Sequence, residues 1–487
     1  MGGKKGGSKR RSGAAAPKRD HELHTFFWPE SVAVVGASNK QGKVGYAIMS
    51  NLVLGAESGG GRGFRGKVFP VNPQVDEVLG KKAYPSIGAV PGRVDMAVLA
   101  VPAALIEGVI DECGRKGVKS IIIISAGFSE SGAEGKAREK LIVERARGAG
   151  MRIIGPNCLG IINTHNGLNT TFTKGIPPKG PISFISQSGA ICTSVIEYSR
   201  EEFMGFANFI SIGNKSDVED ADVIDYLADD PATRAISIYM ESAKDGRKFY
   251  EVLKNKVVPK KPVVILKAGR TAFGAKAASS HTGALAGSDT AYAAAIHEAG
   301  ALRAKTMLEL FDFSRALAYQ PPMMGDGVAI ISNAGGPAVI AADVAYDIGL
   351  PLAQLSKGTI AAIDKVCPPT WSRSNPVDVI GDADLDRYKK TLEILARAPE
   401  VHGIITIIGP QAVMSLMEVA QVIVDISKKS KKPFTASFVG IVHQDSEDYM
   451  DKHGIPEMEV PERPVRAMKA LHHRGLYLRR RGLKWNP

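Results

Sequence analysis

Residues 31–45 read SVAVVGASNKQGKVG, and this run predicts the architecture of the region around it. Its first seven residues are apolar or small and include three valines, which is typical of a buried strand. Glycines follow in the turn, and a helix is expected to begin near Val44 or Gly45. A buried strand that passes through a glycine-rich turn into a helix is the first half of a βαβ unit, so we expect a parallel sheet.

The same alternation of β-rich runs and helix-like segments continues along the chain. It predicts further strands of a first domain at 67–73, 94–102, 120–127 and 152–157. A second series is expected at 180–190, 205–214, 235–241 and 261–269, closed by a helix over about 288–299 that Gly300 caps. Residues 320–327 read as a linker, and a third series is expected at 327–336, 402–410 and 432–440. The sequence therefore predicts three α/β domains in tandem.

The basic charge of the chain is concentrated at its two ends. The net charge is +12, of which residues 1–20 carry +6 and residues 470–487 carry +5. The near-neutral remainder argues against nucleic-acid binding by the folded part. We expect a disordered basic tail at 1–22 and a second basic tail at 471–487, neither with a catalytic role. No apolar run is long enough for a membrane helix, so no membrane contact is expected.

The four cysteines lie far apart, at Cys113, Cys158, Cys192 and Cys367, without a CxxC pair. This spacing argues against a disulfide framework or a zinc site and favours a reducing cytoplasm. None of the histidines has metal-ligand spacing with another His, Cys or carboxylate, so we expect no metal site within this chain.

The turn after the first strand predicts a phosphate site and disfavours NAD. It is not GxGxxG, because Ser38 stands at the position of the second glycine. The next strand closes with Val71, Asn72 and Pro73, whereas a dinucleotide site needs an acidic residue there. A glycine-rich turn before a helix still suits phosphate, because free N–H groups point at the ligand. A tight turn without any ligand remains the alternative.

Four further strand ends carry small residues, proline or asparagine. They read VNP at 71–73, AVPA at 100–103, SAGFSE at 125–130 and GPNCLG at 155–160. Small residues let a backbone approach a ligand closely. A long ligand with phosphates at one end and a pantetheine-like arm fits this edge of the sheet.

These motifs, in this order, resemble the CoA-binding domain of the succinyl-CoA synthetase superfamily. The resemblance implies a Rossmann-like CoA-binding domain at 23–165. It also implies two groups of coenzyme A contacts. The phosphates and adenosine would contact Gly36, Ala37, Ser38, Lys43, Asn72 and Pro73, and the thiol arm would contact Val101, Pro102, Ser125, Ala126 and Gly127. Asn157, in the GPNCLG turn, is included among the CoA-binding candidates.

Residues 267–289, KAGRTAFGAKAASSHTGALAGSD, place one histidine, His281, in a loop rich in glycine and hydroxyl groups. A neutral imidazole in such a loop can attack a phosphoryl group and form a covalent intermediate. Glu241, at the end of a strand on the same sheet edge, could orient the ring by accepting from its far nitrogen. An ordinary surface histidine and a surface glutamate are the alternatives.

Two helix starts offer further phosphate cradles. Ser186, Gln187, Ser188 and Gly189 precede one helix, and Asn333, Ala334, Gly335 and Gly336 precede another. Their free N–H groups and helix dipoles would stabilise a phosphoryl group. Pro337 is expected at the first position of the second helix.

These segments resemble the nucleotide-diphosphate-forming acyl-CoA (acetyl-CoA) synthetase branch of the same superfamily, over about residues 27–464. The resemblance implies a phosphorylated His281, an orienting Glu241, and two flavodoxin-like domains at 166–322 and 323–470. NPVDVIGDAD (375–384) matches the motif after the second helix start.

The resemblance further implies an alpha subunit, because no ATP-grasp domain is visible. The partner would be a beta subunit with that domain, in an α2β2 heterotetramer, with Mg²⁺ bound there with ADP or ATP. Acyl-CoA, phosphate and a carboxylic acid would be the other reactants. The competing interpretations are a CoA-binding regulatory scaffold and the remnant of a protein acyltransferase.

Overall fold

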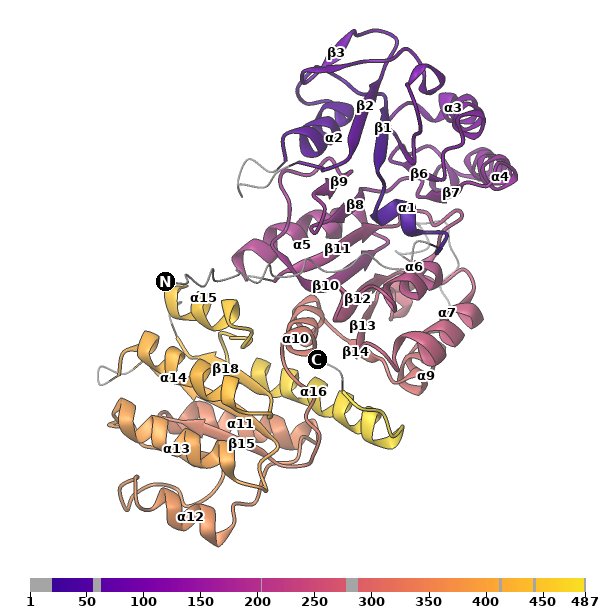
Figure 1. The fold of residues 1–487 in the computed structure, drawn as a ribbon. Coiled ribbons are helices and arrows are strands. Elements are labelled where there is room, and N and C mark those ends of the chain that lie inside the picture. The colour runs from indigo at the N-terminus through magenta and orange to yellow at the C-terminus, as the bar shows by residue number, and fades with distance from the viewer. Residues whose placement is uncertain are drawn as a thin grey trace, which may run out of the picture.

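A computed structural model of the chain describes residues 20–55, 63–202, 204–276, 288–410, 414–440 and 444–485. Figure 1 shows three α/β units that follow one another along the chain, each built on its own sheet. The expected fold class is thereby confirmed. His281 and most of the basic N-terminal tail lie outside the described residues.

The first sheet is parallel and has the strand order β2-β1-β5-β6-β7. Every residue of β1, an interior strand of this sheet, is buried, as its valine-rich sequence predicts. The strands are β1 (Ser31–Val35), β2 (Lys67–Val71), β5 (Met96–Leu99), β6 (Ser120–Ile123) and β7 (Arg152–Ile154). The helices are α1 (His24–Phe27), α2 (Val44–Val53), α3 (Ala103–Lys116) and α4 (Ala133–Gly148), with a small hairpin of β3 (Glu77–Val78) and β4 (Lys81–Lys82).

The second sheet has seven strands in the order β14-β13-β12-β10-β11-β8-β9. Strands β10 to β14 run parallel, whereas β8 pairs antiparallel with β11 and with β9. The strands are β8 (Gly160–Asn163), β9 (Leu168–Asn169), β10 (Lys179–Ser186), β11 (Phe206–Ser211), β12 (Ala235–Met240), β13 (Val263–Lys267) and β14 (Leu302–Ala304). The helices are α5 (Gly189–Glu201), α6 (Asp220–Leu227), α7 (Gly246–Val252), α9 (Asp289–Ala299) and α10 (Met307–Tyr319).

The second sheet begins earlier in the sequence than expected. Strand β8 was assigned to the first domain by the boundary at residue 165, yet its partner is β11. Residues 160–163 are all buried, and this apolar run carries no local signal of the sheet that it joins. The pairing is decided by contacts distant in sequence.

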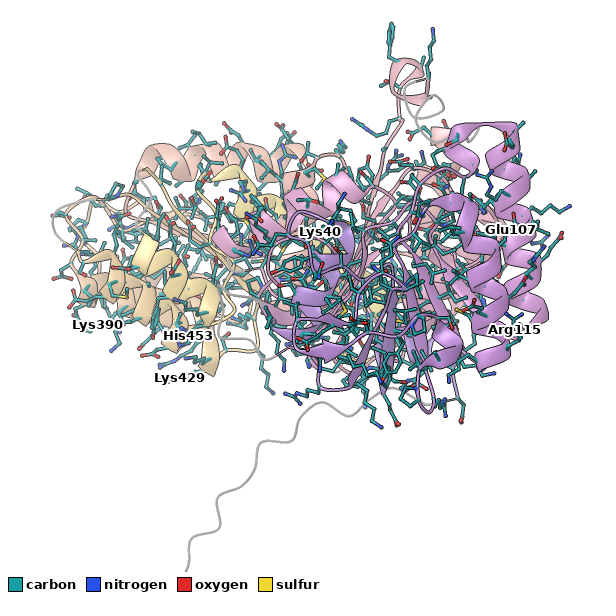
Figure 2. All side chains as sticks on the ribbon, turned by 90° about the horizontal axis from the view of Figure 1, so that it is seen from above. Lys40, Glu107, Arg115, Lys390, Lys429 and His453 are labelled. Atoms are coloured by element: carbon teal, nitrogen blue, oxygen red, sulfur yellow. The ribbon has the colours of Figure 1, made fainter. Side chains whose placement is uncertain are left out.

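The third sheet is parallel, with the order β16-β15-β17-β18. Its strands are β15 (Val328–Ser332), β16 (Val377–Asp378), β17 (Gly403–Ile408) and β18 (Phe434–Phe438). Its helices are α11 (Gly335–Asp347), α12 (Lys357–Ile363), α13 (Leu385–Arg397), α14 (Leu416–Lys429) and α15 (Gln444–Lys452). Arg115 on α3 and Lys390 on α13 lie at opposite ends of the molecule in Figure 2.

The expected basic tail at 471–487 is wrong for its first ten residues, which form the second half of α16 (Glu462–Arg480). Met468, Leu471, Gly475 and Leu478 are buried along one side of this helix at helical spacing. Helix α16 packs along α10, and Leu471 O accepts from Met323 N at 3.1 Å. The dense charge of this segment concealed its apolar face.

The N-terminal end of the described chain also belongs to the fold. The Nε2 atom of His21 lies 3.2 Å from Asp225 Oδ2, and Glu22 forms an ion pair with Arg152. The expected tail over 1–22 is therefore too long by these two residues. No helix of the described residues is long and apolar enough to cross a membrane.

Candidate active site

The first turn brings β1 and the start of α2 into close contact. Gly36 has a φ of +90°, and a Cβ there would lie 2.5 Å from the carbonyl oxygen of Ala100 on the neighbouring strand end. Its N–H donates to Val71 O at 2.9 Å. Lys43 is the N-cap residue of α2 in extended conformation, so the following N–H groups point out of the helix start. The turn is thus held by its own backbone.

The end of β2 is tied to this turn by one side chain. Asn72 Nδ2 donates to Ala37 O at 2.7 Å, and Asn72 Oδ1 accepts from Gln74 N at 2.9 Å. Ser38 Oγ accepts from Lys40 N at 3.1 Å, within the glycine-rich turn. Gly36, Ala37, Ser38 and Asn72 therefore lie together, and Pro73 follows on the same strand end.

The other candidate CoA contacts form a second linked group. Ser125 Oγ donates to Val101 O at 2.5 Å, and Ser125 O accepts from Asn157 N at 3.0 Å. Pro102 is the N-cap residue of α3. Ala126 and Gly127 continue the same turn. All of these residues follow the carboxyl ends of β5, β6 and β7, as expected for a ligand edge.

Glu130 organises this second group and was not predicted. Its Oε1 accepts from Gly127 N at 2.6 Å and from Phe128 N at 3.1 Å. Asn214 of the second domain donates to Oε2 at 2.5 Å. Burial by itself would raise the pKa of Glu130, but these hydrogen bonds lower it below its usual value. The carboxylate joins the SAGFSE turn to the second domain.

The start of α5 is shaped by a reciprocal pair of hydrogen bonds. Ser186 Oγ donates to Ser188 O at 2.9 Å and accepts from Ser188 N at 3.0 Å. Ser188 is the N-cap, and its Oγ accepts from Ile191 N at 3.3 Å. Helix α5 begins at Gly189, where a Cβ would meet nothing within 4 Å. Space for a ligand therefore adjoins the helix start.

Gln187 connects this helix start to Glu241. Its Oε1 accepts from Glu241 N at 2.9 Å and from Ser242 N at 3.1 Å. Its Nε2 donates to Ser242 O at 2.8 Å and lies 3.2 Å from Asp220 Oδ2. Glu241 follows β12 directly and is partly exposed. The amide thus fixes the backbone that carries the candidate orienting carboxylate.

A buried ion pair supports the same turn and was missed in the sequence. Lys215 Nζ lies 2.8 Å from Asp220 Oδ2 and donates to Ser242 O. Both side chains are almost completely buried, with 4% and 2% of their surface exposed. Lys215 also has a φ of +54°. A lysine with left-handed backbone, a short distance before an aspartate, carries no recognisable sequence signal.

Tyr292 on α9 reaches the segment that follows Glu241. Its hydroxyl accepts from Ala243 N at 2.9 Å. Lys267, at the end of β13, has its Nζ 4.7 Å from the centre of the Tyr292 ring. Burial lowers the pKa of Lys267 below its usual value, against the opposing effect of Asp289. The amine of Lys267, the first residue of the segment that contains His281, therefore lies against the Tyr292 ring.

The start of α11 repeats the hydrogen-bond pair of α5. Ser332 Oγ donates to Ala334 O and accepts from Ala334 N, both at 2.9 Å. Asn333 Oδ1 accepts from Gly409 N at 2.8 Å, and its Nδ2 donates to Gly409 O at 3.0 Å. A Cβ on Gly335 would lie 3.0 Å from Asp378 Oδ2, whereas one on Gly336 would meet nothing within 4 Å. Asn333 is thus a structural link between strand ends.

Pro337 does not hold the expected first helical position. Helix α11 begins at Gly335, so Pro337 is its third residue. The error follows from the pair of glycines, which adopt helical geometry here although glycine is a poor helix former. Proline is still tolerated, because the N–H groups of the first turn have no partner within the helix.

Three family models cover most of the chain. The CoA binding domain matches residues 30–164, the succinyl-CoA ligase-like flavodoxin domain 179–317, and the ligase-CoA domain 328–475. The alpha subunit of acetate–CoA ligase [ADP-forming] I from Pyrococcus furiosus is 44% identical over 457 residues, which are 92% of this chain and 97% of the relative. The chain belongs to the family of ADP-forming acetate–CoA ligases. The expected resemblance is confirmed.

Two further matches show how the chain relates to this family. The dinucleotide forming acetyl-coenzyme A synthetase 1 of Candidatus Korarchaeum cryptofilum, solved with phosphate and ADP, is 36% identical. The similarity covers 95% of this chain and 99% of that chain, with a TM-score of 0.89. Acetate–CoA ligase [ADP-forming] I from Archaeoglobus fulgidus is 42% identical over 92% of this chain, which spans 63% of that longer relative.

Proposed function

We propose that this chain is the alpha subunit of an ADP-forming acyl-CoA synthetase, which binds coenzyme A and carries a phosphoryl group on His281. The observation that carries the proposal is the link between Gln187 and Glu241. The start of α5, with its free N–H groups, and the carboxylate of Glu241 lie at the same edge of the second sheet. The segment that contains His281 follows β13, which ends at this edge. The membership of the family supports the reaction class.

In the proposed reaction, phosphate attacks the thioester carbonyl of acyl-CoA. An acyl phosphate forms, and coenzyme A leaves as its thiol. The free N–H groups at the starts of α5 and α11 stabilise the negative charge of the phosphoryl group. A ring nitrogen of His281 then attacks phosphorus, and the carboxylate leaves. Glu241 accepts from the other ring nitrogen and stabilises the cationic phosphoimidazole.

The phosphoryl group would then pass to ADP on a separate beta subunit with an ATP-grasp domain. Two findings support a partner: the Pyrococcus relative is named a subunit alpha, and the Archaeoglobus relative extends well beyond the part that matches this chain. We propose an α2β2 assembly, with Mg²⁺ bound with the nucleotide on the beta subunit. In the reverse direction, the same reaction activates a carboxylic acid with ATP. We further propose a cytoplasmic location, which the four free, buried cysteines support.

Coenzyme A would lie along the edge of the first sheet. Its phosphates would contact the turn of Gly36 and Ser38 and the start of α2, where the N–H groups point outward. Its thiol arm would pass Val101 and Gly127, which Ser125 and Glu130 hold in place. The link from Glu130 to Asn214 would keep the thioester close to the second domain.

The experiment is to incubate the purified chain with acetyl-CoA and labelled phosphate and to map the label. We expect an acid-labile, base-stable phosphoryl group on the peptide that contains His281, and none in a His281→Asn variant. Glu241→Gln should reduce the rate of labelling while it leaves coenzyme A binding unchanged. Coenzyme A binding without any labelling would instead support the regulatory scaffold, which the ligase names of the relatives do not favour.

A further inference from the structure

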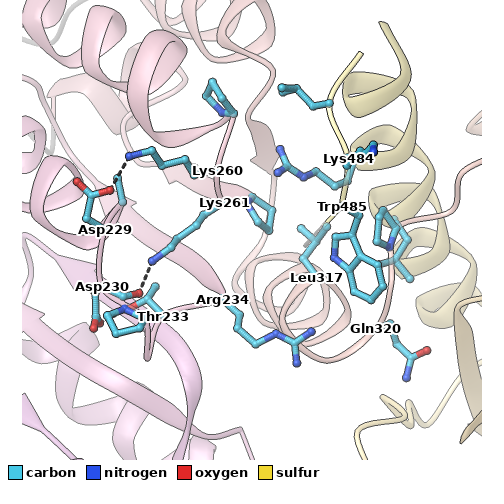
Figure 3. A pocket seen from close by; sticks show the side chains of 18 residues that line it. Asp229, Asp230, Thr233, Arg234, Lys260, Lys261, Leu317, Gln320, Lys484 and Trp485 are labelled. Atoms are coloured by element: carbon cyan, nitrogen blue, oxygen red, sulfur yellow. Dashed lines mark hydrogen bonds and ion pairs between the residues drawn. The ribbon is translucent and has the colours of Figure 1, made fainter. Parts of the chain in front are cut away.

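A cavity of about 670 Å³ lies on the side of the second sheet away from Glu241. Its wall includes Arg234, which precedes β12, and Lys261, which precedes β13. Glu241 follows the opposite end of β12, so the strand of six residues separates the two places by about 20 Å. Leu317 of α10 and the chain after α16 complete the wall (Figure 3). The cavity is therefore separate from the candidate active site.

The wall of the cavity carries more positive charge than its acids can neutralise. Its charged members are five cations and two acids: Arg234, Lys260, Lys261, Arg474, Lys484, Asp229 and Asp230. Asp229 is 2.5 Å from Lys260, and Asp230 is buried and accepts from Asn208 at 2.8 Å and Thr233 at 2.6 Å. Asp229 offsets the charge of Lys260, and the carboxylate of Asp230, whose hydrogen-bond partners are neutral, acts on the neighbouring Lys261. Five cations and two acids leave the wall with a net charge of +3.

Arg474 is the most informative of these cations, because only 5% of its surface is exposed. Its Nη1 donates to Val258 O at 2.6 Å. Within the described part of the chain it forms no ion pair. Burial lowers its pKa to about 10, against the opposing effect of Tyr477. The guanidinium carbon also lies 5.4 Å from the centre of the Tyr477 ring, a contact that offsets part of the cost of burial. Neither partner carries a negative charge, so an anion would satisfy the remaining donors.

The amine of Lys261 is also a partly buried positive charge whose hydrogen-bond partners are neutral. It donates to Leu227 O at 2.6 Å and to Asp230 O, and burial lowers its pKa to about 8. Leu227 is the last residue of α6, so the amine caps the C-terminal end of this helix, which is its structural role. Carbonyl oxygens satisfy hydrogen bonds without cancelling a full charge. Capping therefore explains the position of Lys261 and leaves the surplus charge of the cavity unexplained.

The mouth of the cavity adds exposed cations and one aromatic ring. Figure 3 shows Lys484 and Trp485 on one side, Lys260 and Lys261 on the other, and Arg234 between them. Trp485 is 38% exposed and belongs to the cavity wall, so its indole ring is accessible to a ligand there. Guanidinium groups match phosphate oxygens in geometry, and an indole suits a planar ring.

We propose that this cavity binds a diphosphate anion, either free pyrophosphate or the diphosphate group of a nucleotide. Arg474 and Lys261 would contact the buried end of the anion, and Arg234 and Lys484 its exposed end. A nucleobase, where present, would stack on Trp485. The site joins the second domain to α16 and to the chain that follows it, so its occupant would hold these parts of the chain together.

The test uses the full chain and follows tryptophan fluorescence while pyrophosphate, and separately ADP, is added. We expect a saturable change whose apparent Kd rises about tenfold in Arg234→Gln and in Lys484→Gln, the effect of one lost charge-assisted hydrogen bond. Both side chains are exposed, so these variants should fold. Trp485→Phe should lose the fluorescence change but still release heat of binding in calorimetry.

Lys390→Gln is the matched control, since Lys390 is an exposed cation on α13, a helix that contributes no residue to the cavity wall. It should bind both probes as the parent does. Tighter binding of ADP than of pyrophosphate would identify the nucleotide as the occupant, and equal binding would identify the diphosphate alone. No fluorescence change, or the same Kd in Arg234→Gln, Lys484→Gln and Lys390→Gln, would overturn the proposal.

Discussion

The side-chain amide of Gln187 is bonded to the backbone of Glu241, with 2.9 Å between Oε1 and the Glu241 nitrogen. The same oxygen accepts from Ser242, and the amide nitrogen donates to Ser242 O and to Asp220. Gln187 belongs to the turn before α5, while Glu241 follows β12. One side chain therefore sets the distance between the helix start that would hold phosphate and the carboxylate that would orient the histidine.

Replacing Gln187 by Ala is expected to slow phosphorylation of His281 by about 100-fold, because a small misplacement of a positioning group has that size of effect. Coenzyme A binding should remain as in the parent, since Gln187 lies outside the first domain. The measurement is the rate of label incorporation from acetyl-CoA and phosphate. Ser194→Ala, on the exposed side of α5, is the control and should be neutral. A parental rate in Gln187→Ala would contradict the positioning role.

Tyr292→Phe removes the hydroxyl that accepts from Ala243 N at 2.9 Å. We expect the free energy of unfolding to fall by about 1 kcal/mol, the usual value of such a bond, and phosphorylation to slow. The ring remains, so its contact with Lys267 should persist. Denaturant unfolding and label incorporation are the two measurements. Tyr250→Phe is the control, because its hydroxyl bonds to the exposed Glu298, and an equal loss in both variants would refute a specific effect.

Gly36→Ala should weaken coenzyme A binding and stability together. Its φ of +90° costs a residue with a Cβ about 1–3 kcal/mol, and the Cβ would also press on Ala100 O at 2.5 Å. Calorimetry with coenzyme A and thermal unfolding measure the two effects. Gly80→Ala separates them, since Gly80 has a φ of +74° with open space around it. It should lose stability alone, and unchanged coenzyme A affinity in Gly36→Ala would argue against this turn as the site.

The buried Glu457 should make stability depend on pH. Burial raises its pKa from 4.5 to about 8, while its Oε1 accepts from Phe438 N at 2.8 Å. Between these two values the folded chain keeps a proton that the unfolded chain has released, so the free energy of unfolding falls as the pH rises.

Glu457→Gln, which mimics the protonated form, should flatten that fall between about pH 4.5 and 8. Denaturant midpoints measured across this interval are the test. The exposed Glu459 offers the control Glu459→Gln, which should leave the slope as in the parent. A slope that is unchanged in Glu457→Gln would show that another group carries the dependence.

Local sequence was sufficient to predict most of the strands and the turns at their ends. Ser31–Val35, Phe206–Ser211 and Gly403–Ile408 are apolar runs between turn residues, and each forms a buried strand as expected. The turns at Gly36 and Ser188 were readable because positive φ values and helix caps select particular residue types. Such preferences act over a few residues, so a single sequence displays them.

The pairing of strands and the hydrogen bonds between distant segments could not be predicted from local sequence. Strand β8 joins the second sheet through β11, and Glu130 joins two domains through Asn214. Apolar strands and polar side chains of this kind accept many partners, and only the packed chain selects one. The order of the motifs thus follows from short-range residue preferences, whereas the meeting of Gln187 with Glu241, 54 residues apart, depends on the sheet that places their strands side by side.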